Sequence, residues 1–151
     1  MKFIISGPPI PKARPRACRR GNFVTIYNSQ KSEDQLCILE MQNQLSEYAN
    51  SPDRVTRYEA RDMPNYDVYY VDMRFYIKIP GSWKVAQKKA ALDESVLAYS
   101  KPDLDNLIKF VQDCGNGVLW RDDCRIATLT AAKYYSPNPR TEIEVCGNFL
   151  S

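Results

Sequence analysis

The chain has 151 residues, enough for one domain with a hydrophobic core and too few to expect two. Hydrophobic residues make up 44% and charged residues 26%, as in ordinary globular proteins, and the formal net charge is only +3. Histidine is absent, which excludes Ser-His and Cys-His nucleophile pairs, His-Glu-x-x-His metalloprotease sites and nucleases that use a histidine base. If the protein is a hydrolase, carboxylates and lysine must carry the chemistry.

The sequence contains no apolar run of about 18 residues, so we expect no membrane span. The apolar start at 3–5 is too short for a secretion signal. The five cysteines are odd in number and form no Cys-x-x-Cys pair. This pattern argues for a reducing cytoplasm, and against both a disulfide framework and a zinc site.

The first 31 residues carry seven lysines and arginines and no acidic residue. After an expected strand at 2–6, prolines prevent regular structure to about residue 16. A hairpin is expected next, in which Arg16–Ala17 pairs with Phe23–Tyr27. Arginines on a stiff, extended loop lose little entropy when they bind phosphates, which favours contact with a DNA backbone. A solvated basic loop is the alternative. The residues expected to make this contact are Lys12, Arg14, Arg16, Arg19 and Arg20.

A long helix is predicted at about 30–49, because apolar residues such as Cys37 and Met41 recur there at helical spacing. Ser32 and Gln35 form a candidate capping box at its start. We expect this helix to be a scaffold element that packs on the sheet.

Residues 50–65 are polar and contain prolines, so we expect a loop there. Acidic residues dilute its arginines, which receive little weight as DNA contacts. A strand is predicted at 66–79, where tyrosine and β-branched residues are frequent. A helix capped by Ser82 should follow. It carries Lys84 and Lys88 on one face, and it is either a second DNA-contacting element or a lysine-rich surface helix.

The C-terminal part alternates apolar and polar residues, which predicts strands at Ile126–Tyr135 and Thr141–Cys146. We expect these two strands to pair as an antiparallel hairpin that closes the sheet. Because strands and helices do not alternate regularly, the fold class is predicted to be α+β. The chain would form a single domain over 1–151, with one mixed β-sheet and helices packed on it.

The stretch 101–126 has the most regular helical pattern in the chain. Apolar residues at 104, 107, 108 and 111 predict a helix at about 104–114, which Asp103 would cap and Gly115 or Gly117 would end. The residues Val118–Trp120 are predicted to form a short strand or extended segment.

Acidic side chains and one lysine gather around this helix. Asp105 and Lys109 are four residues apart and share a face. Asp103 can approach Asp105 if it lies in an extended segment before the first turn, and a chain that turns back after the helix can bring the Asp122-Asp123 pair close. Clustered carboxylates are tolerated when Mg²⁺ or Mn²⁺ neutralises them. The alternative is an ordinary helix cap, an ordinary surface ion pair and a solvated loop.

These residues resemble a known signature. Pro-Asp-Leu-Asp-Asn-Leu-Ile-Lys at 102–109, an aspartate at 113, an apolar run and Asp-Asp at 122–123 are similar to the pattern of the RusA family of Holliday junction resolvases. Pro-Lys-Ala-Arg-Pro-Arg at 11–16 is similar to a segment of the family's phage branch. The resemblance implies an Mg²⁺-dependent endonuclease that cuts four-way DNA junctions as a homodimer, in the cytoplasm of a bacterial or phage-infected cell.

The resemblance also implies residue roles. Asp103, Asp105 and Asp123 would bind Mg²⁺, for which Mn²⁺ can substitute, and Lys109 would assist the reaction. Asp122 remains the alternative to Asp123 as a ligand. Apart from the resemblance, the residues whose positive charge is expected to hold the DNA backbone are Lys12, Arg14, Arg16, Arg19, Arg20, Lys84, Lys88 and Lys101.

Two other functions stay open at this point. One is a non-catalytic DNA-binding or phage regulatory module, in which the acids are only a cap and a solvated loop. The other is a nuclease that prefers flaps or replication forks, which these residues do not separate from a junction resolvase.

Overall fold

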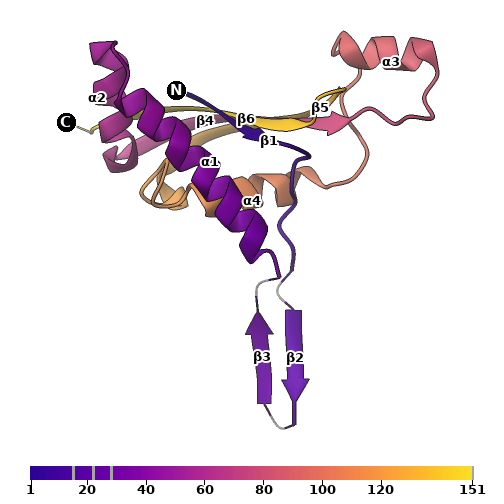
Figure 1. The fold of residues 1–151 in the computed structure, drawn as a ribbon, viewed down its shortest axis with the longest axis horizontal. Helices are drawn as coiled ribbons and strands as arrows, with labels where there is room; N and C mark the ends of the chain where they lie inside the picture. Colours follow the sequence, from indigo (N-terminus) through magenta and orange to yellow (C-terminus); the bar gives the residue numbers. More distant parts are fainter. Residues whose placement is uncertain (15, 22, 28, 151) are drawn as a thin grey trace.

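The computed structural model describes residues 1–14, 16–21, 23–27 and 29–150, without the side chains of 16–18, 20 and 25–27. A four-stranded mixed sheet carries helices on one face, and a two-stranded hairpin projects away from it (Figure 1). The strands of the sheet are β1 (Lys2–Ser6), β4 (Val68–Lys78), β5 (Ile126–Ser136) and β6 (Arg140–Asn148). The hairpin consists of β2 (Arg16–Arg20) and β3 (Phe23–Tyr27).

The helices of the described part are α1 (Lys31–Ala49), α2 (Arg54–Asp62), α3 (Val85–Leu92) and α4 (Leu104–Gly115), with short 3₁₀ turns η1 (Met63–Asn65) and η2 (Asp123–Arg125). The predicted α+β class with one mixed sheet is confirmed. None of the described helices is both long and apolar enough to cross a membrane.

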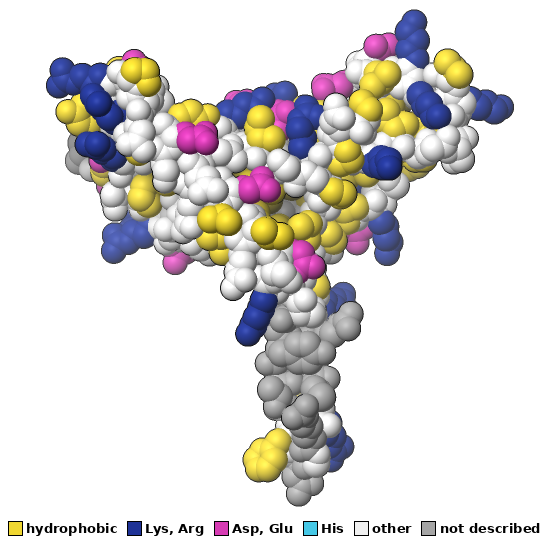
Figure 2. Space-filling view, viewed as in Figure 1, with side chains coloured by type: hydrophobic (Ala, Val, Ile, Leu, Met, Phe, Trp, Pro, Cys, Tyr) yellow, Lys and Arg dark blue, Asp and Glu magenta, His cyan; other side chains and the backbone are white. Residues whose placement is uncertain are grey.

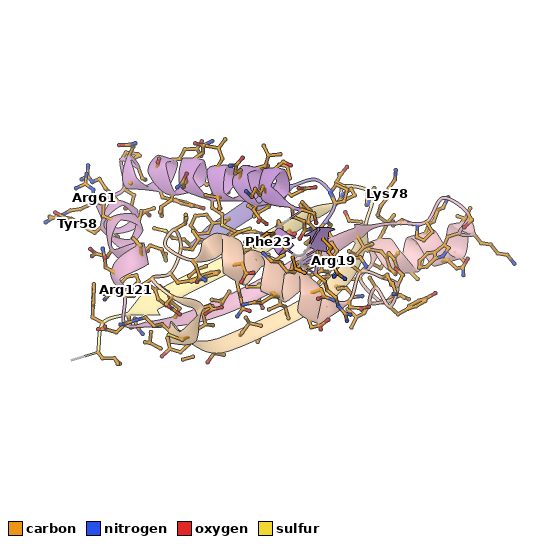
Figure 3. The ribbon with its side chains drawn as sticks, turned by 90° about the horizontal axis from the view of Figure 1, so that it is seen from below. Arg19, Phe23, Tyr58, Arg61, Lys78 and Arg121 are labelled. Atoms are coloured by element: carbon orange, nitrogen blue, oxygen red, sulfur yellow. The ribbon has the colours of Figure 1, made fainter. Side chains whose placement is uncertain are left out.

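The core lies between the sheet and the helices α1 and α4, which Figure 3 shows lying across it. Alternate residues of β4, from Tyr69 to Phe75, are buried because successive side chains of a strand point to opposite faces. They pack with Met41 of α1 and with Leu107 and Val111 of α4. Burial of this stripe fixes α4 against the sheet, and α4 carries the acidic residues of interest.

Helix α1 also closes the outer edge of β1. The side-chain amide of Gln44 accepts a hydrogen bond from Ile4 N at 2.8 Å and donates one to Ile4 O at 2.7 Å. Glu40 accepts from Ser6 N at 2.8 Å, and the Tyr48 hydroxyl donates to Lys2 O at 2.6 Å. Side chains of α1 therefore take the place of a neighbouring strand.

The prediction that the two C-terminal strands pair as a hairpin is wrong. The strand order is β1-β6-β4-β5, so β4 lies between β5 and β6. β4 pairs with β5 in parallel and with β6 antiparallel. Alternation along a strand shows which side chains face the core, but it does not show which strands lie at its two edges.

The prediction of a loop at 50–65 is also wrong, because α2 and η1 occupy most of it. Asp53 caps α2 by accepting a hydrogen bond from Thr56 N at 2.7 Å. Within 50–65, the buried residues are Ala60 and Met63. With so few buried apolar residues, the helical spacing of this segment is carried by polar residues.

Two expected caps lie elsewhere. Gln30, rather than a box of Ser32 and Gln35, precedes α1, and Lys84, rather than Ser82, precedes α3. Gln30 uses its amide on a neighbouring segment, accepting from Ala13 N at 2.6 Å and donating to the Pro11 carbonyl at 2.8 Å. These starts are set by tertiary contacts more than by local capping chemistry.

Candidate active site

Helix α4 begins where the apolar spacing predicts. Asp103 is its N-cap residue, with extended backbone angles φ −70° and ψ 140°, and Asp105 lies in the first turn. Both side chains are exposed, and neither makes a hydrogen bond or ion pair with a described residue. The Asp103 carboxylate does not cap the helix, so two carboxylates at the start of α4 are free to bind another group.

The sheet fixes the segment that precedes these two acids. The Lys133 ammonium on β5 donates hydrogen bonds to the carbonyls of Ser100 at 2.6 Å and Pro102 at 2.8 Å. The Ser100 hydroxyl is 3.3 Å from the Tyr135 hydroxyl. Lys133 therefore anchors the backbone beside Asp103. A single lysine in an alternating strand gives no sequence signal for this role.

A tight turn after α4 sends the chain back along the helix. The Gly115 carbonyl accepts hydrogen bonds from the backbone amides of Val118, Leu119 and Trp120, at 3.0, 2.9 and 3.3 Å. Gly117 has φ +74°, a conformation that favours glycine. The short strand or extended segment expected at 118–120 is therefore not formed, because Val118 and Leu119 lie in the turn and Trp120 makes a single bridge with Asn116. The buried Trp120 ring lies against Gly115.

The two acids that follow this turn make different contacts. The Asp122 side chain accepts a hydrogen bond from Cys124 N at 3.0 Å and stays with its own turn. The Asp123 Oδ2 atom lies 3.3 Å from the Lys109 Nζ atom on α4. Asp123 is therefore the acid of the pair that faces the helix.

Lys109 lies between two carboxylates. Its Nζ atom is 2.9 Å from Asp113 Oδ1, in addition to its contact with Asp123. The Asp113 carboxylate, and secondly that of Asp123, raise the pKa of Lys109 above its ordinary value. The ammonium is thus held charged and oriented. The alternative of an ordinary surface ion pair between Asp105 and Lys109 is not what forms, because Lys109 pairs with Asp113 and Asp123.

Asp113 joins Lys109 to the N-terminal segment. Its Oδ2 atom is 2.9 Å from Lys12 Nζ. Burial opposes the charged form of Asp113, but the hydrogen bonds and charges of Lys109 and Lys12 outweigh it, so the pKa of this carboxyl lies below its usual value. Lys12 reaches this position because its backbone amide donates to the Asn106 carbonyl of α4 at 2.8 Å.

The three aspartates expected to bind metal do not converge in the described residues. No three Asp, Glu, Cys or His side chains there form a group suited to a metal ion. Asp103 and Asp105 lie at the start of α4, whereas Asp123 is neutralised by Lys109. Like charges repel, so carboxylates stay apart unless a cation gathers them, and Lys109 supplies such a charge to Asp113 and Asp123. The carboxylates of Asp103 and Asp105, which have no partner among the described residues, still suit a divalent ion that prefers oxygen ligands.

Comparison with known proteins decides the family. A sequence model described as "Endodeoxyribonuclease RusA" matches residues 6–146, nearly the whole chain and all of the region described above. The chain belongs to the RusA family. The resemblance seen in the sequence is thereby confirmed, and the RusA match makes the protein an endodeoxyribonuclease by class.

One relative of this RusA family member is the "Uncharacterized protein YqaN" of Bacillus subtilis (strain 168). The two sequences are 26% identical over 150 residues, which cover 96% of this chain and 94% of the relative. The similarity therefore extends over the whole fold and is not confined to α4.

The basic residues expected to contact DNA lie at several places on the RusA fold. Arg19 is exposed on the projecting hairpin, and its Nε atom donates to the Gly21 carbonyl at 3.2 Å. Arg16 and Arg20 lie on the same strand, with side chains outside the described part. Lys88 donates to the Gly81 carbonyl at 3.1 Å. Of the same basic set, three residues have exposed side chains and make no ion pair with a described residue: Arg14, Lys84 and Lys101.

Lys12 differs from the other members of this basic set. Its ammonium is engaged by Asp113 at 2.9 Å and lies 4.0 Å from Asp34, so it belongs to the charged group on α4. Its position predicts an effect on Lys109 through Asp113 as well as an effect on DNA.

Proposed function

We propose that this RusA family member is a structure-selective endonuclease that resolves four-way DNA junctions by Mg²⁺-dependent phosphodiester hydrolysis, in recombination and repair. The observation that carries the proposal is the arrangement on α4. Two carboxylates with no partner among the described residues stand at its start. One turn after Asp105, the charged Lys109 is held by Asp113 of the same helix and by Asp123 of η2.

The chain's carboxylates suit a divalent cation. Asp103 and Asp105 would hold Mg²⁺, or Mn²⁺ in its place, through oxygen atoms that have no other described partner. Asp123 is the proposed third ligand, and it would exchange its contact with Lys109 to take that part. A divalent ion held there supplies a polarised phosphate and an activated water.

Lys109 would neutralise the charge that develops on the phosphate or on the leaving oxygen. Asp113 would keep the ammonium oriented when Asp123 turns to another partner, because it binds Lys109 independently at 2.9 Å. Lys12 balances the second oxygen of Asp113. The lysine is therefore held by more than one contact, which suits a group that must stay in place.

A homodimer is part of the proposal. A four-way junction has two symmetric cleavage points, and one chain carries one such set of acids. A two-fold dimer would present two sets to one junction, since a symmetric dimer repeats the same surface on both subunits.

The test is cleavage of a labelled synthetic four-way junction, with matched duplex and flap substrates, in Mg²⁺ and in EDTA. We expect paired nicks near the crossover in Mg²⁺ and none in EDTA or on duplex. If flaps are cut in preference to junctions, the substrate is a flap or fork and not a four-way junction. Junction binding without cutting in Mg²⁺ or Mn²⁺ would reject the catalytic role in favour of a DNA-binding module.

Replacing Lys133 with methionine should raise the Mg²⁺ concentration needed for half-maximal cleavage by about tenfold to a hundredfold, as loss of an outer-shell partner does in metal sites. Methionine cannot donate to the Ser100 and Pro102 carbonyls, so the backbone beside Asp103 loses its anchor. Cleavage rates measured over a Mg²⁺ titration check this, with Lys133→Arg as a donor-retaining control. An unchanged Mg²⁺ midpoint in a folded Lys133→Met protein contradicts the positioning role.

A further inference from the structure

Helix α2 presents a compact basic face that none of the roles above uses. Arg54, Arg57, Tyr58 and Arg61 recur at i, i+3, i+4 and i+7, so they share one side of the helix. Ala60, on another side, is buried at 2% exposure and attaches α2 to the rest of the fold. Lys and Arg side chains gather over α2 in Figure 2.

The arginines of this face are not held in ion pairs by described residues, although the charges of Arg57 and Asp53 act on each other. None of its three guanidinium groups makes an ion pair or hydrogen bond with a described residue, and the acids Glu59 and Asp62 lie to one side of it. The Arg54 guanidinium lies over the Tyr58 ring, 5.5 Å from its centroid, and Tyr58 is 52% exposed. Free arginine forks beside an exposed ring are the chemistry that binds phosphate and stacks on sugars or bases.

The face is joined to the candidate site through a short series of contacts. The backbone amide of Arg121, which directly precedes the acidic pair, donates to the Tyr69 hydroxyl at 3.3 Å. That hydroxyl donates to the carbonyl of Met63, the residue after α2, at 2.8 Å. Figure 3 shows Arg121, Tyr58 and Arg61 at the same end of the molecule.

We propose that this face of α2 binds the phosphate backbone of a DNA arm that leads away from the α4 acids. The proposal rests on the proposed function, since it assigns a second contact with the same substrate. Arg54 and Arg61 are seven residues apart, which is about 10 Å along a helix. That length corresponds to about three base-pair steps along the axis of a DNA arm, at a rise of about 3.4 Å each.

The test is fluorescence anisotropy on a labelled four-way junction in EDTA, with salt varied. For Arg54→Gln/Arg61→Gln, the slope of log affinity against log salt should be smaller than in the wild type by about 2, because each phosphate contact contributes about 0.9. Affinity at about 0.15 M salt should fall tenfold or more. Both arginines are exposed, and thermal melting confirms that the variant is folded.

The control is Arg74→Gln/Lys78→Gln, which removes the same charge. Arg74 pairs with Asp72 at 3.3 Å, and Lys78 lies at the other end of the molecule (Figure 3). An unchanged slope in the α2 variant, or an equal loss in the control, overturns the α2 site. A wild-type protein that binds no junction overturns it as well.

Wild-type cleavage in Mg²⁺, measured on the same junction, keeps the two proposals separate. If the wild type cleaves the junction and the α2 variant binds it as the wild type does, the α2 site alone is rejected. Binding that depends on α2 without any cleavage supports the α2 site and rejects the nuclease mechanism.

Discussion

Replacing Asp105 with asparagine is expected to lower junction cleavage about a thousandfold, which corresponds to about 4 kcal/mol of transition-state stabilisation. Asparagine keeps the shape of the side chain but removes its charge and one oxygen that could bind the cation. Junction affinity in EDTA should be unchanged or tighter, because an exposed negative charge near the phosphates is lost. Single-turnover cleavage and anisotropy measure the two quantities.

The control for this substitution is Asp93→Asn, an identical chemical change at an exposed residue beyond the end of α3. It should cut at close to the wild-type rate. Wild-type cleavage by a folded Asp105→Asn protein would remove Asp105 from the active site and leave the acidic start of α4 without its proposed role.

Replacing Gly115 with alanine is expected to lower the free energy of unfolding by about 1–3 kcal/mol, the usual cost of an overpacked core. A Cβ atom at this position would lie 2.2 Å from the Cζ2 atom of Trp120, whose ring is fully buried. The ring must therefore move, and with it the turn that carries Asp123 back to Lys109. Urea denaturation measures the change in stability.

Gly81→Ala is the matched control, because a Cβ atom there would meet nothing within 4 Å. Its free energy of unfolding should stay within about 0.5 kcal/mol of the wild type or rise slightly. Equal urea midpoints for the two alanine variants would contradict the tight contact between Gly115 and Trp120.

The centre of the site could be predicted from sequence because its signals are local. The apolar spacing from Leu104 to Val111 sets α4 and its exposed face, and Asp103 and Asp105 follow from that register. The turn after Gly115 was also expected. The acidic pair was expected near the start of α4, whereas Asp123 contacts Lys109 further along the helix and Asp122 stays with its own turn. Whether Asp122 or Asp123 is the metal ligand was left open. A one-residue difference of this kind depends on how η2 packs, and in the structure Asp123 is the acid that contacts Lys109.

The remaining features depend on contacts between distant segments. Lys133 and Lys12 act through partners 31 and 101 residues away, and periodicity says nothing about such pairs. The strand alternation showed which residues of β4 face the core, but it did not show that β5 and β6 flank the same strand. Helix α2 was missed because its helical spacing is carried by arginines, while few of its apolar residues are buried.

The closed edge of β1 has a consequence for self-association. An exposed strand edge offers unpaired amides and carbonyls on which another chain can add a strand, and this is a common start of aggregation. In this protein the outward groups of Lys2, Ile4 and Ser6 already bond to α1. The sheet therefore cannot be extended from β1 while α1 is docked, and any loosening of α1 would expose a template for polymerisation.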